Sequence, residues 1–234
     1  FVTGERSNTI KCFIEEFKDE SVGLVLKTGV SKGSILDREE TKRVMNKTLS
    51  NLGPDYKDRK CKIYLLHGDL TEEQIHSLYN REDIQAYVTA THGEGYGLPI
   101  FEAAYSGMPV VATDWSGHLD FMQAPFMEKS KMKNKKLFAR VEYDLRKIPQ
   151  SAIWPGVLEE DSQWAYPKEM FLKKQMRKVY TNIGMYSKWS QSLKKTLLET
   201  HNNQKIVEKM QKALMSGVTE NSDSQDGDVD VIVL

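Results

Sequence analysis

Residues 86–113 read AYVTATHGEGYGLPIFEAAYSGMPVVAT, and this stretch decides the fold. It begins with a short apolar strand over residues 86–89 and passes into a glycine-rich turn. Pro99 then opens a short helix that Gly107 ends, because proline suits the first turn of a helix and glycine suits the residue beyond its last turn. The apolar run 109–113 follows as a second strand. This order of strand, turn, helix and strand is typical of a parallel α/β sheet.

The glycine-rich turn also predicts a ligand site. Gly95 and Gly97 allow the chain to turn tightly and leave backbone N–H groups accessible. The helix that starts near Pro99 adds unsatisfied N–H groups and a partial positive charge, which favour an anion. Glu94 and Glu102, eight positions apart, can accept hydrogen bonds from hydroxyl groups. Together these groups favour a diphosphate or a sugar, and therefore a nucleotide sugar, as the ligand.

The segments on either side continue the alternation of strands and helices. Thr71 and Gln74 have the spacing of a capping box and predict a helix that ends near Tyr79. We therefore expect a Rossmann-like parallel sheet flanked by helices, with a helical C-terminal end. The patterns predict further strands at 22–28 and 62–66, helices at 9–17, 38–52, 168–186 and 187–215, and loops at 31–37 and 148–166.

Composition narrows the classes of function. Lys plus Arg and Asp plus Glu both total 33, so the formal net charge is zero and a nucleic-acid partner is not favoured. Cys12 and Cys61 do not form a Cys-x-x-Cys pair, so we expect neither a disulfide framework nor a metal site, and a reducing compartment is the simpler interpretation. No apolar run approaches the roughly 18–20 residues that span a bilayer. These features predict a cytoplasmic protein.

The ends of the chain suggest its domain organisation. We expect one domain over residues 1–216 and an acidic, disordered tail over residues 217–234. The chain starts with Phe1 rather than Met, which we interpret as a sign that it is a fragment of a longer product or a processed one.

The motif Glu-Gly-Tyr-Gly-Leu-Pro-Ile-Phe-Glu-Ala, from Glu94 to Ala103, resembles the donor-binding signature of retaining GT-B glycosyltransferases, especially family four. The Leu78-Tyr79 pair, the strand after Gly107 and the loop 114–118 resemble the surroundings of that signature. The resemblance covers roughly residues 1–215 and is most specific over 86–118. It implies the C-terminal, donor-binding half of a two-domain enzyme, whose acceptor-binding N-terminal half is not matched by this chain.

The resemblance also implies roles for individual residues. Glu94 would face the transferred sugar as the catalytic residue, and Glu102 would accept hydrogen bonds from the nucleotide ribose. The donor-binding residues would be Gly95, Tyr96, Gly97 and Leu98, together with Glu102. The implied reaction transfers a sugar from a nucleotide diphosphate to an acceptor hydroxyl of a glycan, lipid or protein. No cofactor or metal is implied, because basic side chains and helix dipoles balance the diphosphate charge.

The basic ligands depart from the family pattern. Arg6 stands where the family places an arginine, but Ser7 stands where it places a lysine. Lys27, at the end of a predicted strand, is the alternative phosphate ligand. Other candidates have a structural alternative. His92 and His67 are candidates for donor contacts and His118 for the acceptor side, each against a role in packing, turn or loop structure. The basic run 129–136 is a candidate for a lipid-linked acceptor or a membrane surface against a solvated face or loop, and the aromatic residues for sugar stacking or for anchoring the long loop: Trp154, Trp164 and Tyr166.

Two other functions remain open at this point. A non-catalytic nucleotide-sugar-binding module is favoured by Ser7 and by the missing acceptor half, and disfavoured by the paired Glu94 and Glu102. A sugar-nucleotide epimerase that shares the GT-B fold would need a second half and further acid and base carboxylates.

Overall fold

The computed structural model describes residues 6–28, 34–53 and 56–220, without the side chains of residues 6, 7 and 216–220. The chain divides into two compact units, residues 1–194 and residues 195–234. The expected boundary between a domain and a tail at residue 216 stays a prediction, since most of that tail lies outside the described residues. No helix among the described residues is long and apolar enough to cross a membrane.

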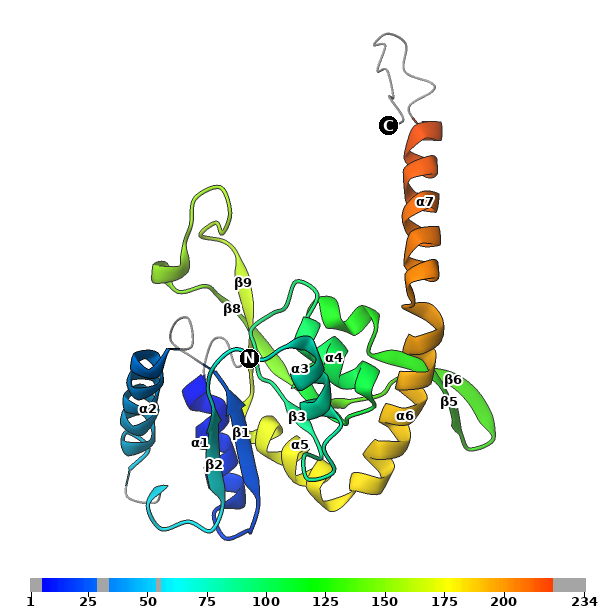
Figure 1. The fold of residues 1–234 in the computed structure, drawn as a ribbon. Helices are drawn as coiled ribbons and strands as arrows, with labels where there is room; N and C mark the ends of the chain where they lie inside the picture. The colour runs from blue at the N-terminus through cyan, green and yellow to red at the C-terminus, as the bar shows by residue number, and fades with distance from the viewer. Residues whose placement is uncertain (1–5, 29–33, 54–55, 221–234) are drawn as a thin grey trace. The chain divides into compact units, whose positions relative to one another are not determined.

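The first unit is an α/β structure built on parallel strands, which confirms the predicted fold class (Figure 1). The strands form two parallel sheets rather than the single sheet that the pattern suggested, because β1 and β3 line a common cavity instead of pairing. The first sheet has the order β1-β2 and the second the order β3-β4-β7. Their bounds are β1 Gly23–Lys27, β2 Lys62–Leu66, β3 Tyr87–Val88, β4 Val110–Thr113 and β7 Ala139–Val141.

Helices connect the strands close to the predicted positions. Thr71 and Gln74 form the expected capping box of α3. The predicted loop 31–37 is wrong for its last residues, because Ser34 and Asp37 form a second capping box that starts α2 at Ile35. The helices of this unit are α1 Arg6–Phe17, α2 Ile35–Ser50, α3 Glu72–Tyr79, α4 Leu98–Ser106 and α5 Glu169–Thr181, followed by α6 Ile183–Thr200, which continues into the second unit.

The packing of α5 against α1 and against the second sheet forms the centre of the hydrophobic core. Leu172 is 1% exposed, and it shares the core with Ile10 of α1 and with Val111 and Val141 of the sheet. Ion pairs reinforce the same interface from the surface, with Lys11 Nζ 2.9 Å from Glu169 and Arg177 Nε 2.7 Å from Glu16. The N-terminal helix is therefore held to a helix that follows it by about 150 residues.

Two antiparallel strand pairs form in regions where the sequence does not predict strands. The predicted loop 148–166 is wrong at its end, where β9 Gln163–Pro167 pairs antiparallel with β8 Tyr143–Lys147. The basic region contains the hairpin of β5 Gln123–Glu128 and β6 Lys131–Lys136. Lysine-rich strands give no clear apolar alternation, so their period of two is difficult to recognise in the sequence. Short 3-10 segments lie at η2 Gly117–Asp120 and η3 Gln150–Ala152.

The C-terminal helices break at positions that the helical pattern does not predict. Asn182 leaves the helical conformation at the end of α5, and its side chain donates to the Lys178 carbonyl (3.2 Å). Asn202 accepts from the Lys205 backbone N–H (3.0 Å) and caps α7 Asn203–Glu220 in the second unit. The predicted single helix over 187–215 is therefore wrong, since short Asn side chains satisfy the backbone groups of the helix ends.

Truncation of Leu172 tests the role of α5. We expect Leu172→Ala to lower the free energy of unfolding by about 2–5 kcal/mol, because it opens a cavity where α1, α5 and the sheet meet. Met170→Ala on the same helix is the control, since Met170 is 67% exposed and should change stability by less than about 0.5 kcal/mol. Urea unfolding followed by circular dichroism measures both, and equal effects would contradict this assignment of the core.

Candidate functional site

The loop between β3 and α4 is held in place by the loop after β4. The Ser116 hydroxyl donates to the Glu94 carbonyl (2.6 Å) and accepts from the Glu94 backbone N–H (2.9 Å). The Gly117 N–H donates to the same carbonyl (3.1 Å). Ser116 has a φ of 96°, a conformation that is uncommon for a residue other than glycine. Three hydrogen bonds thus fix the backbone of the proposed catalytic residue.

Gly97 sets the entry into α4. It has φ 84° and ψ 53°, in the left-handed region, and it forms no side-chain cap. Pro99 lies in the first turn of α4, as predicted, and Gly107 ends the helix with a φ of 84°. Since no side chain caps this end, the first backbone N–H groups of α4 remain available to a ligand. The expected helix N-terminus is therefore present beside the glycine-rich turn.

Packing requires glycine at position 117 but not at position 95, where the sequence predicts that glycine is needed for the turn. Gly95 is not among the described residues with positive φ, and a Cβ added there would meet nothing within 4 Å. The expectation that Gly95 is needed for a tight turn is therefore wrong. A Cβ on Gly117 would overlap the Gly95 carbonyl oxygen. The close approach of the two loops thus depends on Gly117, to which the sequence argument assigned no role.

The two carboxylates lie near a pair of phenols. Glu94 is half-buried, and Glu102, four residues after the start of α4, is exposed. Burial, and then the charges of Tyr87 and Glu102, raise the pKa of Tyr79. Burial and then the charge of Glu94 raise the pKa of Tyr87. Both phenols therefore remain protonated at neutral pH, and the Tyr79 hydroxyl donates to the Pro99 carbonyl in the first turn of α4 (3.3 Å).

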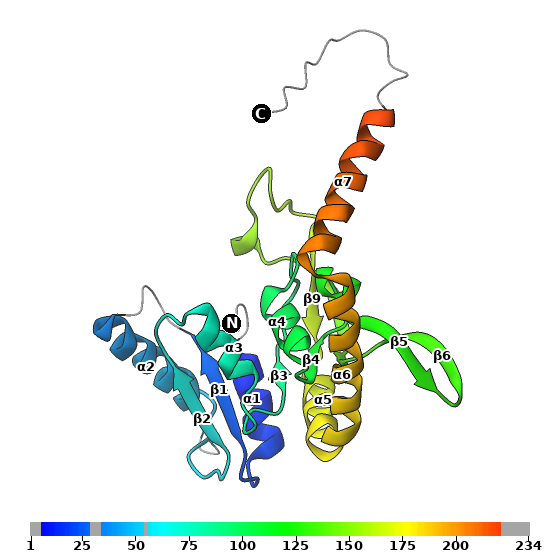
Figure 2. The same cartoon turned by 45° about the vertical axis from the view of Figure 1, so that its right-hand side comes forward.

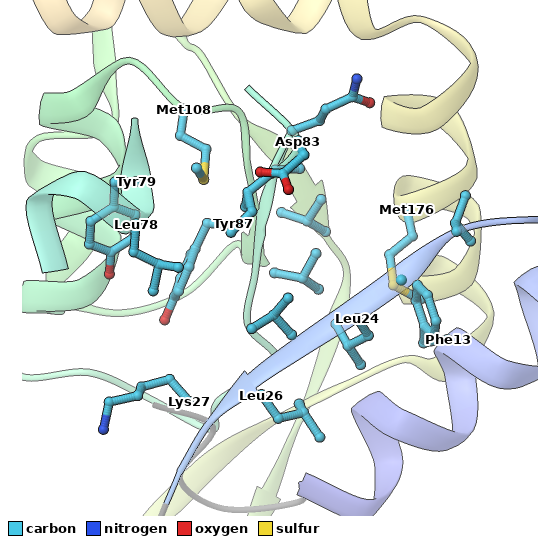
Figure 3. Close-up of a pocket in the computed structure, with 18 of the residues that line it drawn as sticks. Phe13, Leu24, Leu26, Lys27, Leu78, Tyr79, Asp83, Tyr87, Met108 and Met176 are labelled. Carbon is cyan, nitrogen blue, oxygen red and sulfur yellow. The ribbon is translucent and has the colours of Figure 1, made fainter. Parts of the chain in front are cut away.

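A cavity of about 870 Å³ opens beside this group, within residues 9–183 of the first unit (Figure 3). Lys27 from the end of β1 and Glu102 from α4 both line it, together with Tyr79 and Tyr87. The rest of the lining is largely apolar and includes Phe13, Leu24, Met108 and Met176. Figure 3 shows Lys27 and the two phenols along one side of the cavity and Phe13 and Met176 along the other. The cavity thus joins a polar side to an apolar one.

The two candidate phosphate ligands differ in what the structure describes of them. The Lys27 ammonium donates to the Gly68 carbonyl and so lies against the turn that follows β2. Gly68 has a φ of 100°, and His67 and Asp69 belong to the same turn. Arg6 starts α1, but its side chain lies outside the described residues, as does that of Ser7. Lys27 is therefore the candidate that the described structure places in the wall of the cavity that Glu102 also lines.

Other residues of the motif lie outside the cavity wall. Tyr96 is 44% exposed and its ring packs against Phe121, with centroids 5.0 Å apart. Leu98 is 61% exposed, and neither residue lines the cavity among the described positions. Glu94, Gly95 and Gly97 do not line it either. Of the motif, Pro99 and Glu102 line the cavity, whereas Glu94 and the predicted donor-binding residues at 95–98 do not.

His92 makes structural contacts with β9. His92 Nδ1 lies 2.8 Å from the Ala165 carbonyl, and its ring stacks on Trp164 with centroids 5.3 Å apart. Tyr166 contacts the same ring, so Trp164 and Tyr166 anchor β9 as expected, whereas Trp154 is 65% exposed and does not fit that expectation.

His118 is 1% exposed and lies beneath the glycine-rich turn. Its Nε2 is 2.9 Å from the Thr113 carbonyl, and burial lowers its pKa. A Cβ on Gly97 would lie 3.3 Å from the His118 Cβ. His118 is thus a neutral residue that supports the turn. Within the described ranges, no three His, Cys, Asp or Glu side chains cluster as a metal site would require.

Substitution of Gly117 tests the contact between the two loops. We expect Gly117→Ala to lower the free energy of unfolding by about 1–3 kcal/mol, because the new methyl group would overlap backbone. Gly95→Ala is the matched control and should cost less than about 0.5 kcal/mol, since its methyl group would enter open space. Thermal unfolding measures both variants, and a stable Gly117→Ala protein would contradict the proposed packing.

Comparisons with known proteins show that the region around the glycine-rich turn is similar to glycosyltransferases. Residues 62–125 match the family described as Glycosyl transferases group 1, and they include Glu94, Glu102 and the Ser116–Gly117 contact. The chain also aligns with the crystal structure of the C-terminal domain of a glycosyl transferase group 1 family protein (LpcC) from Francisella tularensis. That alignment has 14% identity and a TM-score of 0.43, and it covers 87% of this chain and 96% of that one. No curated protein matches the sequence. The chain is thus similar to glycosyltransferases over the segment that carries the candidate site.

Proposed function

We propose that this chain is the donor-binding half of a retaining glycosyltransferase that uses a nucleotide-diphosphate sugar. The observation that carries the proposal is the common cavity of Lys27 and Glu102. Lys27 ends strand β1 and Glu102 lies in helix α4, 75 positions further along the chain, yet both line one cavity next to the N-terminus of α4. Its volume of about 870 Å³ is within the range of small-molecule sites.

The chemistry of the cavity suits the parts of such a donor. A nucleoside base would enter the largely apolar side, and the exposed Glu102 carboxylate would accept hydrogen bonds from the ribose hydroxyls. The diphosphate would lie between the Lys27 ammonium and the uncapped N–H groups of α4, where both charges favour an anion. No metal is needed in this proposal, because these groups balance the charge of the leaving group.

Glu94 would act on the sugar itself. Hydrogen bonds from Ser116 and Gly117 fix its backbone in the loop that leads into α4. A preorganised carboxylate stabilises the positive charge that develops on the sugar when the bond to the diphosphate breaks. The acceptor hydroxyl would come from the opposite side of the site, which an N-terminal domain outside this chain would complete. We place this enzyme in the cytoplasm, since two lone cysteines fit a reducing compartment.

Nucleotide binding tests the donor site. We expect titration calorimetry with a panel of nucleoside diphosphates to show binding that is unchanged by a metal chelator. Glu102→Gln should weaken it roughly tenfold, since a charged acceptor of hydrogen bonds is lost. Lys27→Ala should weaken it by a similar factor through the lost ammonium. Glu160→Gln, at an exposed position in the loop between β8 and β9, is the matched control and should bind like the unmodified protein.

The absence of binding to every nucleoside diphosphate would overturn the donor-site proposal. If Glu102→Gln and Glu160→Gln bind nucleoside diphosphates equally well, Glu102 does not contact the ligand, although the proposed ligand class still holds.

Sugar transfer tests the catalytic role of Glu94. We expect Glu94→Gln to lower the rate about 10²–10³-fold while nucleotide binding changes little, because the carboxylate acts on the reacting sugar. The assay supplies an acceptor-binding domain in trans and identifies the product anomer by NMR. Retention of configuration supports the proposal, and inversion contradicts it. Nucleotide binding without transfer or donor hydrolysis under any of these conditions would favour the non-catalytic module.

A further inference from the structure

The hairpin of β5 and β6 carries an exposed pair of methionines at its free end. The strands pair with Met127 directly opposite Met132, so both side chains lie on one face of the hairpin. They are 57% and 60% exposed. The connecting residues Lys129 and Ser130 have φ values of 48° and 63°, as in the tight two-residue turns that join such strands. An apolar pair therefore lies one residue from the turn on each strand.

The base of the hairpin is attached to α6. Phe126 packs edge-on against Trp189, with centroids 6.5 Å apart, and Lys135 Nζ lies 4.6 Å from the centroid of the Trp189 ring. Ser192 Oγ donates to the Pro125 carbonyl (3.3 Å). Because side chains alternate along a strand, the face with Met127 and Met132 is the one opposite Phe126. The anchored base thus leaves the methionine face and the tip accessible, as Figure 2 shows for the projecting hairpin.

The charge around the tip is strongly positive. Residues 123–136 contain five lysines and one glutamate, in a chain whose formal net charge is zero. Lys135 pairs with Glu128 (2.9 Å), which directly precedes the turn, and Lys136 pairs with Asp114 (2.7 Å) at the base of the strands. The exposed Lys129 lies in the turn, and the exposed Lys131 and Lys133 alternate with Met132 along β6. The three lysines therefore place positive charge at the same tip as the methionine pair, with Lys131 and Lys133 on the opposite face of the hairpin.

We propose that the tip of this hairpin docks the protein on the surface of an anionic phospholipid bilayer, with Met127 and Met132 entering the interface and the lysines contacting the headgroups. A bilayer surface offers both an apolar layer and negative charge, which is the combination that this tip complements. A nucleic acid would use the lysines but would leave the two methionines without a role. The proposal is independent of the function proposed above.

Vesicle sedimentation of the 234-residue chain tests the docking. We expect binding to phosphatidylcholine vesicles that contain about one third phosphatidylglycerol, and little binding to phosphatidylcholine alone. Binding should weaken as salt is raised, because the lysines are exposed and their attraction is screened. Equal binding to both kinds of vesicle, or none to either, would overturn the proposal.

Charge variants separate the tip from the rest of the surface. We expect the triple variant Lys129→Ala, Lys131→Ala, Lys133→Ala to lose at least tenfold in binding, since each lysine near an anionic surface contributes roughly fivefold. The matched control removes three exposed lysines of α5 and α6 and changes the net charge equally: Lys174→Ala, Lys178→Ala and Lys188→Ala. Equal losses in the two triple variants would overturn the assignment to the hairpin.

The methionine pair is tested separately. We expect Met127→Ser with Met132→Ser to weaken vesicle binding severalfold, and Met127→Leu with Met132→Leu to retain it, while circular dichroism confirms that both proteins are folded. Undiminished binding of the serine variant would overturn the insertion of the tip. If the protein binds a single-stranded oligonucleotide through the same lysines and does not bind vesicles, the surface is assigned to nucleic acid instead.

Discussion

The contact between Ser116–Gly117 and the backbone of Glu94 is the constraint on which the candidate site depends. One serine hydroxyl bonds to both the N–H and the carbonyl of Glu94, and the Gly117 N–H bonds to the same carbonyl. The loops come so close that a side chain on Gly117 would overlap backbone. These bonds fix the start of the turn, and Gly97 then directs the chain into α4. The positions of Glu94 and of the helix N-terminus therefore follow from one contact between two loops.

The buried His118 supports this contact from below. Its Cβ lies close to Gly97, and its Nε2 lies 2.9 Å from the Thr113 carbonyl at the end of β4. A charged imidazole at this depth would be costly, and burial accordingly lowers its pKa. The neutral form is the one that fits the turn. The end of β4, the histidine and the two loops thus form a continuous support for the glycine-rich turn.

Local signals in the sequence predicted the elements that carry the candidate site. Glycine and proline marked both ends of α4, and Thr71 with Gln74 marked the start of α3, because caps and turns depend on residues close in the chain. The lysine-rich β6 and the helix breaks at Asn182 and Asn202 were missed. Their structures depend on cross-strand partners and on single side-chain hydrogen bonds, which periodicity does not reveal. Residues of both parallel sheets line the cavity that contains Lys27 and Glu102. Patterns of residues close in the chain do not reveal which distant segments meet, so the cavity was not predicted either.

Gly95 shows how fold and ligand requirements separate within one motif. Glycine at 97 is explained by its left-handed backbone, and glycine at 117 by the neighbouring carbonyl. Gly95 has neither reason, since it is exposed and the fold leaves room for a side chain there. In the proposed function, a donor diphosphate would approach the backbone of this loop, which runs from Glu94 to the N-terminus of α4. A methyl group at this position would then obstruct the ligand rather than the fold, so binding is the step at which Gly95 would matter.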